Sequence, residues 1–154
     1  MAGVTAGTEV TVTLRLPPNA AHVRTARLIA AAMARRCGIG EGLLDEVRLA
    51  VGEACARAVR QHERNRCPDP ITVEFTESER FSVAVVDRAR PEAGVGAGPG
   101  VPRARVGSSE VPPWTDPSGE ALGLALLSAV VQDLEVAPED DGAGTRVSMS
   151  WPVG

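Results

Sequence analysis

Hydrophobic residues recur every three or four positions from Glu41 to His62, a pattern that predicts one long amphipathic helix. Most charged side chains of this stretch lie away from its apolar stripe. Glu53 is different, because it falls beside the stripe among small residues. Its carboxylate either pairs with Arg57 one helical turn later, as an ordinary surface contact, or has a chemical role. The periodicity alone leaves both interpretations open.

A strand and a shorter helix are predicted before this long helix. Residues 8–16 alternate apolar with polar positions, which is typical of a half-buried strand, and two prolines end the pattern. Asn19 is a suitable N-cap for a helix that continues to about Arg36. The outward face of that helix is basic and includes Arg24 and Arg27. Such a face is either solvated or meets an acidic partner.

Four further strands and a third helix follow the long helix. The strands are predicted at 71–75, 81–86, 134–137 and 145–151, and the helix at about 120–132. Because only a short polar turn separates the first two of these strands, they form a hairpin. Near the start of the third helix, Gly123 offers two interpretations: free N–H groups there suit a phosphate, and close packing against a strand explains the glycine equally well.

The segment 88–118 is rich in glycine and proline and shows no apolar periodicity. It is longer than ordinary connections in compact domains, so a lid, a partner-binding loop and simple disorder are the alternatives. We expect a flexible, lid-like loop within a single domain that spans 1–154.

The order of the elements is strand, helix, helix, strand, strand, loop, helix, strand, strand. In this order the helices cannot all serve as crossovers of a parallel sheet. The sequence therefore predicts an α+β fold. We expect a two-layer sandwich, with three helices on one face of a mainly antiparallel five-stranded sheet.

Composition and charge exclude several kinds of protein. A net charge of -4 and a pI near 5.2 give no overall attraction to nucleic acid. Three cysteines without CxxC spacing do not favour zinc or a disulfide framework, and Cys55 is expected to act as a small apolar residue within its helix. The chain has neither a signal-like N-terminus nor an apolar run of about 18 residues. We expect a cytoplasmic protein that is neither exported nor membrane-spanning.

Four short stretches, together with the order of the elements, resemble a known family. The stretches are VGEACARAVRQH, VAVVDRARP, GEALGLALLSAVVQDLEV and GAGTRVSMSWP. They resemble the anti-sigma-factor serine kinases of bacterial partner-switching systems, which belong to the GHKL (histidine-kinase-like) superfamily of ATP-binding domains with the Bergerat fold. The resemblance covers the chain from Val10 to Trp151.

The resemblance implies roles for three residues at the nucleotide. Glu53 matches the glutamate that orients or activates the attacking hydroxyl, and a carboxylate suits this role because it accepts a proton. Asp87 matches the aspartate that accepts the adenine amino group. Arg57 stands where the family has a magnesium-binding asparagine, and a guanidinium carries only donors. We therefore expect no metal site.

Other motif positions are partly retained. The two glycines that follow the family aspartate are replaced by Ala89 and Pro91, and proline removes both an N–H group and backbone freedom where the nucleotide lies. Gly123 matches the second glycine of the third motif. Gly144 and Thr145 match the final motif. The resemblance thus implies a degenerate nucleotide site.

Two interpretations of Arg57 remain. In the first, Arg57 pairs with Glu53 and fills the space of metal and phosphate, so that no cofactor is expected. In the second, the guanidinium replaces magnesium and pairs directly with phosphate oxygens. ATP and magnesium are expected as cofactors only if the degenerate pocket is functional.

The expected function is that of a kinase-like regulator without efficient phosphoryl transfer. It would bind a sigma factor, a STAS-type anti-anti-sigma protein, or both, with impaired ATP binding. The alternative is an active ATP-dependent serine kinase of a STAS-type protein, with Glu53 as the catalytic base. The resemblance places Arg24 on the partner surface, assisted by Arg27, commonly within a homodimer. Neither nucleic acid nor a membrane is expected as a direct partner.

Overall fold

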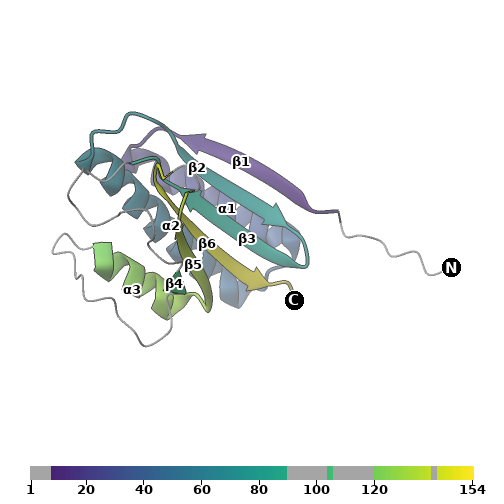
Figure 1. The fold of residues 1–154 in the computed structure, drawn as a ribbon. Helices are drawn as coiled ribbons and strands as arrows, with labels where there is room; N and C mark the ends of the chain where they lie inside the picture. Colours follow the sequence, from purple (N-terminus) through teal and green to yellow (C-terminus); the bar gives the residue numbers. More distant parts are fainter. Residues whose placement is uncertain (1–7, 90–103, 106–119, 140–141) are drawn as a thin grey trace.

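The computed structural model describes residues 8–89, 104–105, 120–139 and 142–154, which form a layer of helices packed on a sheet (Figure 1). The elements are, in order, β1 (Val10–Leu16), the 3₁₀ turn η1 (Ala20–His22), α1 (Val23–Cys37), α2 (Glu41–Arg64), β2 (Ile71–Glu77), β3 (Arg80–Val86), β4 (Ala104–Arg105), α3 (Glu120–Val130), β5 (Asp133–Pro138) and β6 (Thr145–Pro152). None of the helices in these ranges combines the length and the apolar character needed to span a membrane.

The sheet has the strand order β1-β2-β3-β6-β5-β4, and every pair of neighbouring strands is antiparallel. The predicted α+β sandwich is confirmed, with one addition. The two-residue strand β4 pairs with β5, so a sixth short strand comes from the segment expected to be a loop. The rest of that loop, 90–103 and 106–119, lies outside the described residues.

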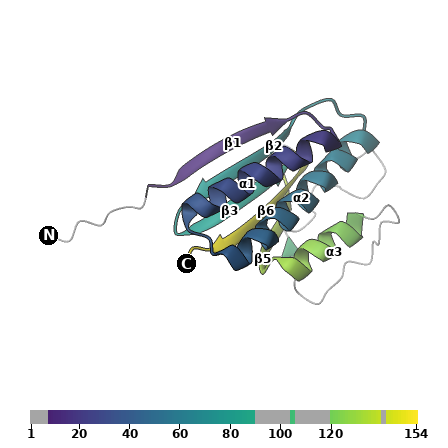
Figure 2. The same cartoon turned by 180° about the vertical axis from the view of Figure 1, so that it is seen from behind.

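All three helices cover the same face of the sheet, as the view from behind shows (Figure 2). Period-two alternation explains why the strands have one apolar face: Ile71, Val73 and Phe75 of β2 are buried, and the residues between them face the uncovered side. The helices contribute the apolar stripes that the sequence predicts. Trp151 of β6 is buried in this core, and its Nε1 donates to the carboxylate of Glu46 on α2 at 3.0 Å.

The helical pair α1–α2 follows the prediction closely. The first predicted helix starts with the 3₁₀ turn η1, and α1 and α2 end one and two residues beyond the predicted ends. The side chain of Asn19 accepts a hydrogen bond from the N–H of Ala21 at 2.9 Å and so caps the first turn. Gly38 ends α1 in the left-handed region at φ 93°, where glycine has no steric penalty. The chain then reverses into α2 within a few residues, so the two helices pack side by side.

Candidate functional site

Arg57 and Asp87 form a buried ion pair between α2 and the segment that follows β3. Nη1 of Arg57 donates to Oδ2 of Asp87 at 3.0 Å, and the two residues are 5% and 2% exposed. In one of the two interpretations from the sequence Arg57 pairs with Glu53, whereas the ion pair that the structure shows is with Asp87. A guanidinium in the interior needs a buried carboxylate, and Glu53 is partly exposed on its helix.

The carboxylate of Asp87 is hydrogen-bonded at both oxygens. Oδ2 accepts from Arg57, and Oδ1 accepts from the backbone N–H groups of Ala89 and Thr145, each at 3.3 Å. Burial raises the pKa of Asp87 above its ordinary value, and the charge and hydrogen bond of Arg57 oppose that rise. The carboxylate expected from the resemblance to accept the adenine amino group thus already accepts hydrogen bonds from the protein itself.

Gly144 lets the start of β6 approach the backbone of Asp87. Its φ is 111°, and a Cβ at this position would lie 2.7 Å from the carbonyl carbon of Asp87. The close approach allows the N–H of Asp87 to donate to the carbonyl of Thr145 at 3.0 Å. In this chain the Gly144–Thr145 motif therefore has a structural role that glycine alone fits.

His62 holds the segment after Asp87 in place, a role that the sequence analysis missed. It is 1% exposed; its Nε2 accepts the N–H of Arg88 at 2.8 Å, and its Nδ1 lies 3.0 Å from the carbonyl of Asp69. Because a backbone N–H only donates, Nε2 carries no proton, so Nδ1 carries it and donates to Asp69. The spacing of the sequence could have predicted that His62 is buried, because it lies one turn after Ala58 on the apolar stripe of α2.

The structure brings most of the predicted nucleotide-site residues together. Arg57, Asp87, Ala89 and the Gly144–Thr145 pair meet at one end of the sheet. Glu53 lies one turn before Arg57 on the same helix.

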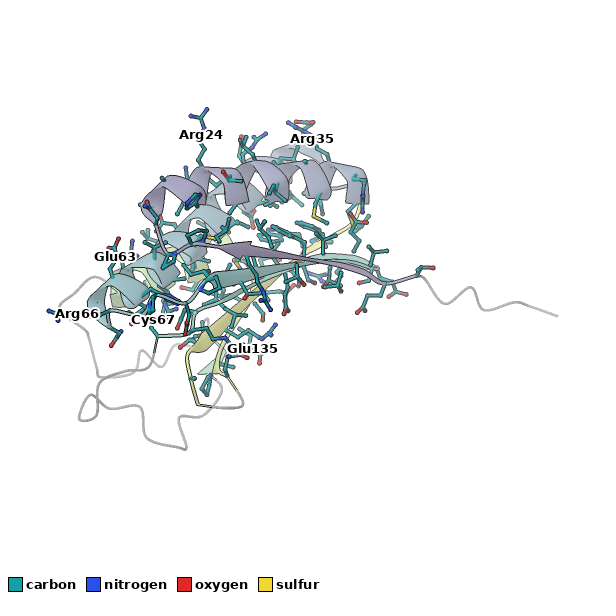
Figure 3. The ribbon with its side chains drawn as sticks, turned by 90° about the horizontal axis from the view of Figure 1, so that it is seen from above. Arg24, Arg35, Glu63, Arg66, Cys67 and Glu135 are labelled. Carbon is teal, nitrogen blue, oxygen red and sulfur yellow. The ribbon has the colours of Figure 1, made fainter. Side chains whose placement is uncertain are left out.

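The remaining predicted residues lie elsewhere. Gly123 is part of α3, which packs against α2. Pro91 lies outside the described residues. Arg24 and Arg27 are exposed on α1, and Arg24 points away from the sheet (Figure 3). The predicted partner residues and the predicted nucleotide residues thus belong to two separate surfaces.

The donor set at this end of the sheet does not fit a magnesium nucleotide held as in the family. Arg57 offers only N–H groups where a metal needs an oxygen ligand. Asp87 is buried and already accepts hydrogen bonds at both oxygens. Within the described ranges, moreover, no three His, Cys, Asp or Glu side chains gather into a group able to hold a metal ion.

Cys55 has a structural role in α2. All three cysteines are free thiols, and Cys55 is buried. Burial raises the pKa of Cys55 to about 12, so its thiol stays protonated and packs as a small apolar group, as the sequence predicts.

Comparisons with known proteins agree with the fold. A family model described as "Histidine kinase-like ATPase domain" matches residues 16–151. The "Serine-protein kinase RsbW" of Bacillus mycoides (strain KBAB4) is 25% identical over 129 residues, which cover 82% of this chain and 77% of that protein.

Among solved structures, the RsbU and RsbW domains of Rv1364c from Mycobacterium tuberculosis match with a TM-score of 0.61 at 15% identity. This match covers 94% of this chain and 32% of the other, so the chain spans about a third of that longer protein. At this identity the likeness supports the fold alone.

Proposed function

Because the chain belongs to the histidine kinase-like ATPase domain family, we propose that it is a kinase-like regulator of a sigma-factor partner switch in which ATP binding is impaired. It binds a sigma factor, a STAS-type anti-anti-sigma protein, or both. The similarity to the serine-protein kinase RsbW, together with the motif resemblance, supports this class of partner. The loss of nucleotide binding is supported by the geometry around Arg57.

The single observation that carries impaired ATP binding is the buried Arg57–Asp87 pair. An adenine that took Asp87 as its acceptor would have to displace the guanidinium from the carboxylate. Leaving one partner of a buried ion pair without its counter-charge costs about 3–5 kcal/mol. Since each 1.4 kcal/mol is about a factor of ten, ATP affinity falls by roughly two to three and a half orders of magnitude.

The second candidate function is an active ATP-dependent serine kinase of a STAS-type protein. Glu53 favours it, because this carboxylate is retained on α2 and is partly exposed, so it remains able to accept a proton from a substrate hydroxyl. The two candidates differ in whether a phosphoryl group is transferred.

Titration with Mg-ATP tests the state of the pocket. A ligand at about 1 mM with a Kd near about 10 μM would stabilise the fold by about 2.7 kcal/mol. We expect a much smaller gain for the wild type, measured as a shift in melting temperature and by calorimetry. Arg57→Asn, alone or with Ala89→Gly and Pro91→Gly, should raise ATP affinity, and Arg48→Asn serves as the exposed control.

Two results would contradict this part of the proposal. A gain of about 2.7 kcal/mol for the wild type would mean that the pocket binds nucleotide. Unchanged ATP affinity in every combination of Arg57→Asn, Ala89→Gly and Pro91→Gly would mean that the motif positions are misassigned.

Binding to purified partners tests the regulator itself. The sigma factors and STAS-type proteins of the source cell are expressed one by one and titrated against the wild-type chain. The regulator proposal predicts a complex with at least one of them and no mass increase of the STAS-type protein after incubation with Mg-ATP. A phosphorylated STAS-type protein would establish the kinase alternative, and the absence of any complex would refute the partner class.

A further inference from the structure

A pocket of about 580 Å³ lies at one end of the sheet. Arg15 of β1, Thr72 of β2 and Arg88, which follows β3, line it together with residues of the connection between α2 and β2. Its volume is in the range of small-molecule binding sites. We call it the Arg15 pocket.

The Arg15 pocket is separate from the predicted nucleotide residues. Thr72 lies between two residues that are buried against the helices, so its side chain points to the uncovered side of the sheet. Arg15 stands directly opposite Thr72 in the register of β1 and β2 and is exposed. The Arg57–Asp87 pair lies instead on the side of the sheet that α2 covers.

One buried side chain holds three residues of the pocket in place. Nδ1 of His62 donates to the carbonyl of Asp69 at 3.0 Å, and its Nε2 accepts the N–H of Arg88 at 2.8 Å. The backbone carbonyl of His62 accepts the N–H of Cys67 at 2.9 Å. Asp69, Arg88 and Cys67 all line the pocket. Because the fold itself fixes these positions, a ligand does not have to order them on binding.

Arg15 brings to the pocket a positive charge that no described residue neutralises. It forms no ion pair in the part of the chain that the structure describes. Arg146, also on the uncovered face, differs because it pairs with both Glu74 and Glu139. A guanidinium presents a planar fork of N–H donors that matches a carboxylate. The free charge of Arg15 therefore favours a ligand with an acidic group.

The remaining lining groups favour a ligand with a carbon body over a bare inorganic anion. Pro70 and Ala143 present apolar side chains to the pocket. The thiol of Cys67 donates to the carbonyl of Arg88 at 3.5 Å, so its proton is directed at the protein. Such groups pack against carbon atoms and offer no strong hydrogen bond to a phosphate ion.

The carboxylate of Asp69 limits where negative charge can sit. Asp69 lines the same pocket and repels an anion that comes close to it. The acidic group of a ligand is therefore best placed at Arg15.

We propose that the Arg15 pocket binds a small organic acid. The carboxylate of the ligand pairs with the guanidinium of Arg15, next to the hydroxyl of Thr72, and its carbon body lies against Pro70 and Ala143. This site lies outside the proposed function and does not rest on it, because no partner protein takes part.

The cysteines of the wild-type chain report directly on the pocket. Cys67 lines it, at the end of the sheet away from Arg24 (Figure 3), whereas Cys37 is half-buried at the end of α1 and serves as the internal control. Alkylation by iodoacetamide is followed at each cysteine by peptide mass spectrometry, at constant ionic strength. With butyrate as the probe at about 50 mM and a Kd of about 5 mM, alkylation of Cys67 should slow about elevenfold. Alkylation of Cys37 should not change.

Two comparison compounds test the chemical class of the ligand. Butyramide has the same carbon body without the charge, and inorganic phosphate has charge without a carbon body. Both should protect Cys67 less than butyrate does. Equal protection by either compound would overturn the assignment of an organic acid.

Two variants with opposite expected effects test the residues. Arg15→Gln should weaken butyrate binding about tenfold, because it removes a charge-assisted pair. Asp69→Asn should strengthen it about twofold, because it removes a repulsive charge. Arg48→Gln, an exposed arginine on α2, is the matched control and should leave protection unchanged. Each variant is compared with its own rate without ligand, and since Arg15 and Asp69 are exposed, melting temperatures should stay close to that of the wild type.

The proposal fails if butyrate does not protect Cys67, or if it slows Cys37 equally. It also fails if Arg15→Gln keeps the wild-type affinity for butyrate, since the carboxylate would then lie elsewhere. None of these outcomes bears on the proposed function. Partner binding is measured in buffer without an organic acid, where the Arg15 pocket takes no part.

Discussion

Arg57 on α2 and Arg24 on α1 carry the same guanidinium, but their surroundings are opposite. Arg57 is buried and paired with Asp87, in the region where the sequence analysis predicts a degenerate nucleotide site. Arg24 is exposed, beside Leu28, and pairs with no described carboxylate. One charge is neutralised within the fold, and the other is exposed to solvent.

The difference shows that one domain can hold a guanidinium either as a buried, paired charge or as an exposed, hydrated one. A buried charge is tolerated only when the fold supplies its counter-charge, so Arg57 and Asp87 belong to the interior as a pair. An exposed charge is hydrated and costs little, so α1 can carry Arg24 without a counter-charge. The same side chain is therefore part of the interior at Arg57 and part of the hydrated surface at Arg24.

The largest expected effect is the loss of the buried charge pair. Arg57→Met leaves the carboxylate of Asp87 buried without its counter-charge and should lower the free energy of unfolding by about 3–5 kcal/mol, measured by urea denaturation. Arg48→Met removes an exposed pair with Asp45 and should cost less than about 1 kcal/mol. Equal stability of Arg57→Met and Arg48→Met would mean that burial does not make the Arg57–Asp87 pair more important than the exposed pair.

A double variant sharpens this prediction. In Arg57→Met/Asp87→Asn, the neutral amide oxygen still accepts the N–H groups of Ala89 and Thr145, and no isolated charge is left. We expect it to regain part of the stability lost in Arg57→Met. Further loss instead of recovery would mean that the charge of Asp87 is not what Arg57 neutralises.

The next largest effect concerns the close approach at Gly144. Gly144→Ala introduces a Cβ against the backbone of Asp87 at a positive φ and should destabilise the fold by roughly 2–4 kcal/mol. Gly142→Ala is the matched control, since Gly142 also has a positive φ, 72°, but faces open space; about 1 kcal/mol is expected there. Equal melting temperatures for the two variants would show that the close approach of Gly144 to Asp87 does not contribute to stability.

Removal of an exposed arginine should affect binding and not stability. Arg24→Ala should weaken the complex with the sigma or STAS-type partner at least about tenfold, or about 1.4 kcal/mol, with the melting temperature unchanged. The control is Arg15→Ala, on the uncovered face of the sheet. It is a better control than Arg146→Ala, because Arg146 forms ion pairs with both Glu74 and Glu139. Unchanged affinity for Arg24→Ala, with loss for Arg146→Ala, would move the interface to the sheet.

The smallest expected effect is the dependence on pH that Asp87 contributes. Since burial raises its folded pKa above the unfolded value of 3.8, the folded state holds a proton at pH values where the unfolded chain has released it. The stability contribution of Asp87 therefore falls as the pH rises from about 4 through the folded pKa, and it is constant above that.

The difference in unfolding free energy between the wild type and Asp87→Asn, measured from about pH 4 to about pH 8, should decrease with rising pH. A difference that instead grows with pH would mean that the attraction of Arg57 outweighs burial at this carboxyl.

The sequence predicted those parts of the fold that depend on local periodicity. The apolar stripe of α2 and the alternation in β6 place the ends of both elements within two residues of their positions in the structure. The four motif stretches also predicted the family, which the match over 16–151 confirms. Periods of 3.6 and 2 residues are visible in any single chain, because neighbours in sequence decide them.

The sequence did not predict β4, because two residues are too few to show a period. Ala104 and Arg105 form a strand only where β5 offers unpaired backbone groups at the edge of the sheet. Nor could spacing reveal that Arg27 lies over Gly52, since that contact depends on how α1 packs against α2.

The sequence by itself determined which chemical groups stand at the motif positions: a guanidinium at Arg57, a carboxylate at Asp87 and a glycine at Gly144. Only the tertiary structure decided what they contact, because Glu53 and Asp87 were both possible partners for Arg57 and differ in burial. Arg57 pairs with Asp87 because both side chains are buried together. An uncompensated buried charge is far more costly than an exposed one.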